Sequence, residues 1–245
     1  MKTRVYIADV SALADEQLFK KYYSQMIAER KDKIDKVRFD KDKRLSLGAG
    51  VLEMLALREG QEDSEAQTAP EAQTAPEAQA GVFTNLSHSG TFAMCAVSNH
   101  EIGCDIEQVR LNHADIAERF FAADEYELVK AQRDKAAQED LFFRLWTLKE
   151  SFMKATRLGF ELPLGDFSIL PEGGVGSHIC IKQHVNESDY ALYEYDLNGV
   201  AEAQSPRETA DDADLEAGYK ASVCIRDYAG EKPELIVIDL KEVDL

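Results

Sequence analysis

The spacing of apolar residues predicts strands alternating with helices. Short runs with a period of two, bounded by turn residues, predict strands at 3–9, 91–97, 102–108, 167–170, 178–183, 190–195, 219–226 and 234–239. Apolar residues three and four apart predict helices over 14–58, 114–137 and 140–157. This order predicts an α+β fold of two α/β halves, which we divide near His100 into residues 1–100 and 101–245.

Two of these helices carry an apolar stripe that should face a core. In the first helix the stripe includes Leu45, Leu52 and Leu55, and in the third it is formed by Leu141, Leu145, Leu148 and Phe152. Gly159 follows the third helix and fits a C-terminal stop. Both helices are therefore expected to pack against strands.

An acidic tandem repeat interrupts this pattern at residues 61–80. The segment QEDSEAQTAPEAQTAPEAQA repeats EAQTAP and holds five acidic and no basic residues. It cannot bury enough apolar surface to offset the entropy of ordering it, so we expect a mobile surface insertion. Residues 200–217 are also acidic and are expected to form a loose loop.

The net charge of −18 argues against a nucleic-acid or anionic-membrane partner. One local exception is the segment 29–44, whose eight basic and five acidic residues give +3 and leave −21 on the rest. No segment has the length and apolarity of a membrane span, and the first residues lack the pattern of a signal peptide. The four cysteines lack CxxC spacing, so we expect reduced core thiols. A cytoplasmic protein is predicted.

The first candidate functional site is Asp105-Ile106-Glu107. Side chains two apart on a strand share a face, so the two carboxylates should converge while Ile106 faces the core. Like charges side by side favour a hard divalent cation such as Mg²⁺. A solvent-facing strand edge with two acids explains the pattern equally well.

The third helix supplies the second candidate, in LWTLKESFMK at 145–154. Glu150 and Lys154 are four apart and share a face with Trp146, beside the apolar stripe. An ordinary surface ion pair, which contributes little to stability, is the simpler interpretation.

Residues 85–90, NLSHSG, are the third candidate. Hydroxyl and backbone N–H groups before a strand can cradle a phosphate, and the glycine permits close approach. A Ser–His hydrolase pair is disfavoured because Ser87 and His88 are adjacent and point oppositely in an extended chain. A polar turn without function remains an alternative.

Together, NLSHSG, IGCDIE at 102–107 and LWTLKESFMK resemble the surfactin-synthetase-activating type of 4′-phosphopantetheinyl transferase. The earlier segment KIDKVRFDKDKRLSLGAGVL is similar to that family as well, so the resemblance covers most of residues 30–170. The family implies two similar α/β halves, each a small mostly antiparallel sheet with helices, related by a pseudo-twofold axis, with the active site between them. It also implies a monomer that uses coenzyme A and Mg²⁺.

The resemblance assigns roles by position. Asp105, Glu107 and Glu150 match the family's metal-binding carboxylates, and Lys154 matches the lysine of its KExxK motif. Residues that match the contacts to coenzyme A phosphates are Ser87, His88, Lys33, Arg30 and Lys31. The sequence departs from the family by having no lysine between Gly60 and Gly81, where many relatives carry one that approaches the nucleotide.

The reaction implied is transfer of 4′-phosphopantetheine from coenzyme A to a serine of an apo carrier protein, with release of 3′,5′-ADP. Either Glu150 or a metal-activated water would remove the serine proton. Two other functions stay open. A Mg²⁺-dependent nuclease also uses scattered carboxylates and a lysine, although its surface should be basic. A non-catalytic module that binds coenzyme A or a carrier protein is the other.

Overall fold

The structure is a computed structural model in which residues 2–67, 81–197, 200 and 218–245 are described. The chain divides into two compact units, one formed by Met1–Ile102 with Glu231–Leu245 and the other by Gly103–Gly230. The boundary expected near His100 lies close to this division. Residues 231–245, expected in the C-terminal half, pack instead with the first unit, because β9 (Glu234–Val237) pairs in parallel with β1 (Arg4–Asp9).

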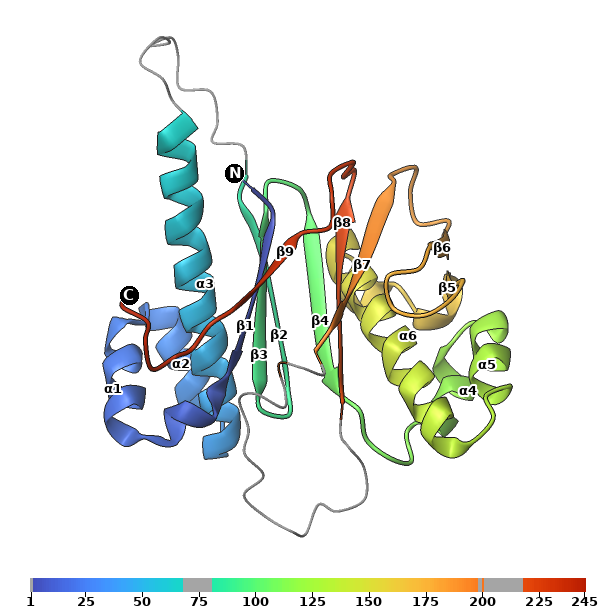
Figure 1. The fold of residues 1–245 in the computed structure, drawn as a ribbon, viewed down its shortest axis with the longest axis horizontal. Helices are drawn as coiled ribbons and strands as arrows, with labels where there is room; N and C mark the ends of the chain where they lie inside the picture. The colour runs from blue at the N-terminus through green and yellow to red at the C-terminus, as the bar shows by residue number, and fades with distance from the viewer. Residues whose placement is uncertain (1, 68–80, 198–199, 201–217) are drawn as a thin grey trace. The chain divides into compact units, whose positions relative to one another are not determined.

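The first unit is a four-stranded sheet covered by helices on one face. Its strand order is β2-β3-β1-β9, with β2 at Phe83–Ser89 and β3 at Phe92–Ser98, and β3 runs antiparallel to both neighbours. The helical layer holds a 3₁₀ turn at Val10–Ala14, α1 (Glu16–Gln25), α2 (Ala28–Lys36) and α3 (Asp40–Gln67), as Figure 1 shows. The core lies between α3 and the sheet, where Leu45, Leu52 and Leu55 are buried as predicted.

The second unit contains a three-stranded sheet in the order β4-β8-β7. These strands span β4 (Ile102–Gln108), β7 (Tyr190–Asp196) and β8 (Tyr219–Arg226), and β7 runs antiparallel to β8. The long helix α6 (Lys135–Thr156) lies against this sheet (Figure 1). Beyond it are η2 (Ala114–Ile116), α4 (Ala117–Phe120), α5 (Ala123–Lys130), η3 (Gly159–Glu161), η4 (Leu164–Asp166) and the antiparallel pair β5 (Ser168–Pro171) and β6 (Ile179–Lys182).

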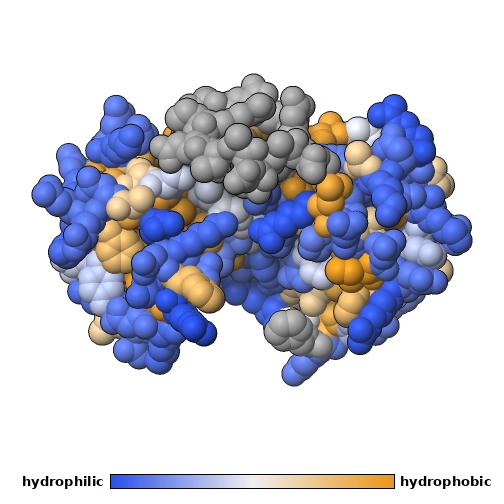
Figure 2. Space-filling model, turned by 90° about the horizontal axis from the view of Figure 1, so that it is seen from below, coloured by the Kyte–Doolittle hydropathy of each residue, from blue (hydrophilic) through white to orange (hydrophobic). Residues whose placement is uncertain are grey.

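Both units agree with the predicted α+β class and its small, mainly antiparallel sheets. Hydrophilic residues dominate the face shown in Figure 2, and its apolar patches are small. Within the described part of the chain, no helix combines the length and the apolar character that crossing a bilayer requires.

Several element boundaries differ from the predictions for local physical reasons. The helix expected over 14–58 is broken into α1, α2 and α3, and Asp15 caps α1 by accepting from the backbone N–H groups of Gln17 and Leu18. Helix α3 continues to Gln67, into the segment expected to be a mobile insertion, because Glu, Gln and Ala are strong helix formers. The other residues of that insertion, 68–80, lie outside the described residues, as do 201–217 of the acidic loop.

The helix expected over 114–137 is also interrupted. Asp134 caps a new helix by accepting from the backbone N–H of Ala137, so α6 begins at Lys135 rather than at 140. It ends at Thr156, and its C-cap residue Arg157 adopts the left-handed conformation at φ 63°, two residues before the Gly159 that was expected to stop the helix. Most of α6 is buried, including Lys149 and Ser151, so the single apolar stripe was too narrow a prediction.

Gly103 lets β4 and α6 approach closely. A Cβ at this position would lie 2.1 Å from the Ser151 carbonyl oxygen and 2.6 Å from the Ala155 amide nitrogen, both backbone atoms of α6. Backbone atoms cannot rotate away, so any side chain at residue 103 must push the helix off the strand. The glycine is therefore a packing requirement.

We predict that Gly103→Ala lowers the free energy of unfolding by about 1–3 kcal/mol, because the added methyl group overpacks the interface. Urea denaturation followed by circular dichroism measures this change. Gly174→Ala is the matched control, since an added Cβ there meets nothing within 4 Å and should change stability by less than about 0.5 kcal/mol. Equal stability of the two variants would contradict the close packing of β4 on α6.

Candidate active site

Asp105 lies in the middle of β4 and is buried, with 4% of its surface exposed. Ile106 is fully buried and Glu107 is partly buried. The strand is thus covered on both faces at Asp105, which excludes the interpretation of this motif as a solvent-facing edge. A buried carboxylate needs a compensating partner.

Lys154 of α6 provides that partner. Its Nζ donates to Asp105 Oδ1 at 2.8 Å and to the Cys104 carbonyl oxygen at 2.9 Å. Spacing along the helix had suggested a surface ion pair between Glu150 and Lys154, but the lysine reaches across to β4 instead. The close approach at Gly103, two residues before Asp105, makes this cross-link possible.

Glu150 belongs to the same electrostatic cluster. Burial raises the pKa of its carboxyl, the nearby Asp105 raises it further, and Lys154 acts in the opposite direction. Burial by itself would lower the pKa of Lys154, but Asp105 and Glu150 outweigh it and raise that pKa above its usual value. The cluster therefore holds two carboxylates and one lysine that stays cationic, an arrangement suited to moving a proton and binding a phosphate.

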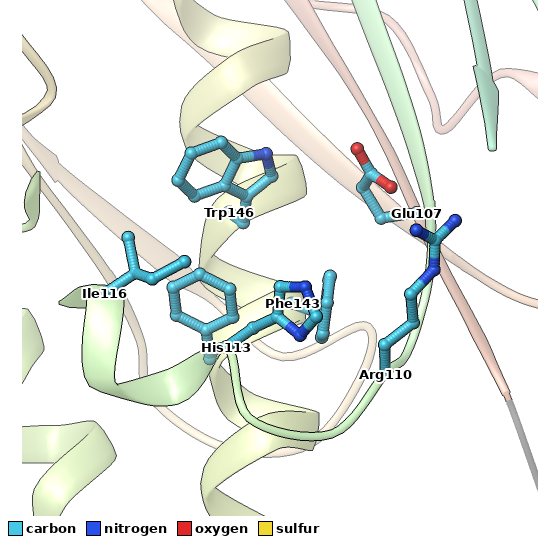
Figure 3. A pocket seen from close by; sticks show the side chains of 7 residues that line it. Glu107, Arg110, His113, Ile116, Phe143 and Trp146 are labelled. Atoms are coloured by element: carbon cyan, nitrogen blue, oxygen red, sulfur yellow. The ribbon is translucent and has the colours of Figure 1, made fainter.

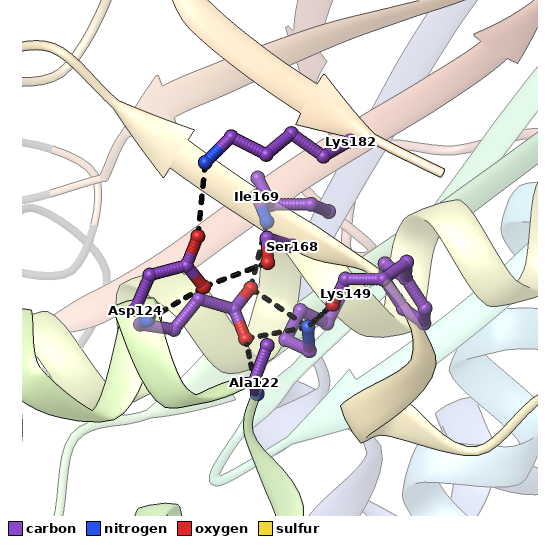
Figure 4. A network of polar contacts seen from close by, with 8 residues as sticks. Ala122, Asp124, Lys149, Ser168, Ile169 and Lys182 are labelled. Atoms are coloured by element: carbon purple, nitrogen blue, oxygen red, sulfur yellow. Dashed lines mark hydrogen bonds and ion pairs between the residues drawn. The ribbon is translucent and has the colours of Figure 1, made fainter. Parts of the chain in front are cut away.

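Beside this cluster, Lys149 forms a fully buried ion pair that sequence reasoning missed. Its Nζ donates to both carboxylate oxygens of Glu125 at 2.7 Å and to the Phe167 carbonyl oxygen at 2.7 Å, as Figure 4 shows. Glu125 also accepts from the backbone N–H groups of Ala122 and Ile169. Lys149 looks like a surface residue in the sequence, and only the burial of the whole helix reveals its role.

This ion pair ties three elements together next to Glu150. Burial raises the pKa of Glu125 and lowers that of Lys149, while their mutual attraction opposes both shifts. The neighbouring Asp124 accepts from Ser168 Oγ at 2.7 Å and from Lys182 Nζ at 3.0 Å, which links α5 to β5 and β6 (Figure 4). Helix α6 is thereby fixed at the residue that precedes Glu150.

A cavity of about 210 Å³ lies beside Glu107 in the same unit. Figure 3 shows Glu107 and Arg110 at one end and the side chains of Ile116 and Trp146 at the other. Its remaining lining residues are His113, Phe142 and Phe143. Trp146 had been noted in the sequence, but nothing there indicated that Arg110 and His113 join it.

Most of the NLSHSG segment forms the end of strand β2 rather than a polar turn, and phosphate binding by it stays a prediction. Ser87 and His88 lie in β2 and pair with Met94 and Ala93 of β3, and the chain reverses at Gly90, which has φ 61°. As expected for an extended chain, the two adjacent residues lie on opposite faces of the strand. His88 is exposed and Ser87 is half-buried. The chain turns at Gly90 and Thr91, so β3 begins at Phe92, one residue after the strand start predicted at Thr91.

The basic residues of α2 already have protein partners. Arg30 Nη2 donates to Glu53 Oε2 at 2.7 Å, and only 16% of the arginine side chain is exposed. Lys31 donates to the Ser24 carbonyl oxygen, and Lys33 pairs with Glu29 at 2.8 Å on the surface. Exposed pairs are weak, so Lys33 can exchange its partner for a phosphate at little cost, whereas Arg30 would have to leave Glu53.

The predicted metal ligands are only partly brought together. Among the described residues, no group of three or more His, Cys, Asp and Glu side chains is close enough to hold a metal ion. Asp105 does act on Glu150 electrostatically, and Asp105 is buried while Glu150 is partly buried. Two neighbouring carboxylates with hard oxygen atoms are chemically suited to Mg²⁺. The trio with Glu107 stays a prediction.

Comparison with known proteins identifies the segment that carries this cluster. Residues 101–205 match the model of the 4′-phosphopantetheinyl transferase superfamily. The superfamily that the three sequence motifs suggested is therefore the one whose model matches this segment, which holds Asp105, Glu150 and Lys154.

Curated relatives of the matched segment are transferases of the same name. Over 85 residues, 35% of this chain, it is 45% identical to 4′-phosphopantetheinyl transferase Sfp of Bacillus subtilis (strain 168). Over 140 residues, 57% of this chain, it is 31% identical to 4′-phosphopantetheinyl transferase gsp of Aneurinibacillus migulanus. These alignments span 38% and 50% of the relatives' own lengths, so the chain spans at most half of either protein.

Two further comparisons are with a human protein and with a solved structure. The human L-aminoadipate-semialdehyde dehydrogenase-phosphopantetheinyl transferase is 35% identical over 97 residues, which cover 36% of this chain and 31% of that protein. A solved structure, Thermotoga maritima holo-[acyl-carrier-protein] synthase, is 17% identical with a TM-score of 0.34, covering 52% of this chain and 62% of that one. That TM-score is too low to compare the two folds.

We predict that Lys149→Met lowers the free energy of unfolding by about 3–5 kcal/mol, because it leaves the Glu125 carboxylate buried without a cation. Thermal and urea denaturation measure the loss. Adding Glu125→Gln to Lys149→Met should restore part of it, since the amide removes the buried charge. The matched control is Glu127→Gln on the exposed side of α5, with an expected change below about 0.5 kcal/mol. A Lys149→Met protein as stable as this control would refute the role of the pair.

Proposed function

We propose that this protein is a Mg²⁺-dependent 4′-phosphopantetheinyl transferase that transfers phosphopantetheine from coenzyme A to a serine of an apo carrier protein. The observation that carries the proposal is the cluster of Asp105, Glu150 and Lys154 at the contact of β4 with α6. This cluster lies within the segment that matches the model of the superfamily. The names of the relatives support the same reaction.

Asp105 and Glu150, together with Glu107, would hold the Mg²⁺. When bound, the ion would neutralise the negative charge of the coenzyme A pyrophosphate. Lys154, now bonded to Asp105, would supply a second positive charge on the side of α6. Local positive charges are needed to bind an anionic substrate because the net charge of the chain is −18.

Glu150 and Lys154 would divide the proton transfer and the charge stabilisation between them. The carrier serine oxygen forms the new bond to phosphorus, and the bond from phosphorus to the oxygen of 3′,5′-ADP breaks. Glu150, or a water held by the site, would take the serine proton. Lys154 donates hydrogen bonds to the departing phosphate.

The contacts to the nucleotide phosphates would come from the residues that the resemblance assigned to this role. Ser87 and the exposed His88 of β2 are the proposed ligands, together with Lys33 of α2. Lys31 and Arg30 are weaker candidates, because both donate to protein oxygens in the structure. We infer further that the protein acts as a cytoplasmic monomer without nucleic-acid or membrane partners, which the acidic charge supports.

We predict that the protein transfers label from radioactive coenzyme A to an apo carrier protein in the presence of Mg²⁺. The label should stay on the carrier through denaturing electrophoresis and should be absent when EDTA is added. A non-catalytic module would bind coenzyme A without labelling the carrier, and a nuclease would instead degrade nucleic acid. Either result would overturn the transferase proposal.

We predict that Glu150→Gln and Lys154→Met each reduce the transfer rate on the order of 10²-fold or more at saturating Mg²⁺, because the first removes the base and the second the cation. Initial rates of carrier labelling give the comparison. Glu187→Gln is the matched control, since Glu187 is exposed in the same unit and should retain full activity. Near-normal turnover by Glu150→Gln would remove Glu150 from both the base and the metal site.

A further inference from the structure

Arg144 and Glu194 form a buried ion pair outside the Asp105 cluster. The arginine lies in the first half of α6 and the glutamate in β7, and their side chains are 10% and 4% exposed. Arg144 Nε donates to Glu194 Oε1 at 2.6 Å, and Arg144 Nη2 donates to Glu194 Oε2 at 2.8 Å. In this two-bond geometry an arginine and a carboxylate fix each other's direction as well as their separation.

The same arginine also holds the loop between β5 and β6. Its Nη1 donates to the Gly173 carbonyl oxygen at 2.6 Å, and its Nη2 donates to the Gly174 carbonyl oxygen at 3.0 Å. Lys149, five residues further along α6, donates to the Phe167 carbonyl oxygen just before β5. Two cations of one helix therefore hold β5 from both of its ends.

A second polar contact joins α6 to the sheet next to Glu150. Ser222 of β8 donates through its Oγ to Ser151 Oγ at 3.0 Å, and both serines are fully buried. Ser222 is paired with Glu194 across the antiparallel strands, so these two residues point to the same face of the sheet. Arg144 and Ser151 are seven residues apart, almost two full turns, so they share one side of the helix. The two contacts thus form one row along the interface of α6 with β7 and β8.

Apolar packing alone would leave the position of α6 along its axis weakly defined. Leu148 and Phe152 belong to the same core cluster as Cys224 of β8. Because apolar contact has no direction, a helix can slide by one turn, about 5.4 Å, and still bury a similar surface. A slip of this kind would leave the Glu194 carboxylate buried without its cation. Buried ion pairs add little stability compared with apolar residues, but they can select one arrangement among several.

The register of α6 decides where the proposed catalytic groups lie. Glu150 and Lys154 follow Arg144 by six and ten residues on the same helix. Lys154 Nζ lies 2.8 Å from Asp105 Oδ1, so a slip of one turn would break this contact. We propose that the Arg144–Glu194 pair sets the register of α6 and thereby brings its acid and its lysine to Asp105. The pair acts through the helix as a positioning device, and its catalytic consequence rests on the proposed function.

Replacing both members of the pair separates positioning from stability. We expect Arg144→Met/Glu194→Leu to melt at or above the temperature of the unmodified protein, because apolar side chains replace a buried ion pair. The carbonyl groups of Gly173 and Gly174 lie in an exposed loop, where water can replace the arginine. The kcat for carrier labelling at saturating Mg²⁺ and substrates should nevertheless fall about tenfold or more, since a displacement of about 1 Å can cost about 10²-fold. Arg144→Met alone should melt at a lower temperature, and adding Glu194→Leu should reverse that loss.

A crystal structure of the double variant measures the position of the helix directly. We expect α6 to shift along its axis against β8, and the distance from Lys154 Nζ to Asp105 Oδ1 to exceed the present 2.8 Å. The matched control is Lys130→Gln/Glu127→Gln, which removes an exposed ion pair of α5, 3.8 Å long, in the same unit. It should leave kcat, the melting temperature and this distance unchanged, because exposed pairs contribute little.

The outcomes distinguish this proposal from the proposed function. A stable double variant with full kcat would show that the pair serves folding alone, which overturns the positioning role while the transferase function stands. An unshifted α6 would overturn that role as well, and so would a loss of kcat that merely follows the fraction of unfolded protein. If the unmodified protein labels no carrier, the proposed function fails, and the crystal structure of the double variant still decides whether the pair sets the register of α6.

Discussion

The close packing of β4 against α6 is the constraint on which the candidate site depends. Gly103 has no side chain, and this lets the backbone of α6 approach β4 at Ser151 and Ala155. Lys154 can then reach Asp105 and the Cys104 carbonyl oxygen, and Glu150 comes close enough to Asp105 for the charge of Asp105 to raise the pKa of Glu150. Acidic and basic groups separated by about fifty residues become one electrostatic unit because two backbones touch.

A buried ion pair next to Glu150 holds α6 in this position. The Lys149–Glu125 pair fixes α6 to α5, and the same lysine holds the Phe167 carbonyl just before β5. A charge pair in this environment contributes little net stability over apolar packing, but removing one partner is costly, so it defines a single position for the helix. Adjacent lysine and glutamate residues thereby take different roles, one in anchoring the helix and the other in the site.

The sequence predicted local features better than long-range ones. Periodicity located β4, β8 and the core face of α3, because side-chain spacing is a property of neighbouring residues. It did not predict that β9 returns to pair with β1, which depends on contacts across more than two hundred residues. It took the hairpin strand at Ser87 and His88 for a turn, since small polar residues are typical of both. The motifs supplied Asp105, Glu150 and Lys154, but the partner of Lys154, the burial of Lys149 and the pairing of Arg30 with Glu53 required the three-dimensional structure.

The central claim, that Asp105 and Glu150 act as one cation-binding site next to Lys154, is tested most directly by locating a metal. Crystals grown with coenzyme A and Mn²⁺, as a stand-in for Mg²⁺, would show the ion by anomalous scattering. We expect the ion to bind carboxylate oxygens of both residues at about 2.1 Å, the distance typical of Mg²⁺. Lys154 should lie beside the pyrophosphate. An ion bound away from Asp105, or a Glu150 side chain directed away from it, would contradict the account.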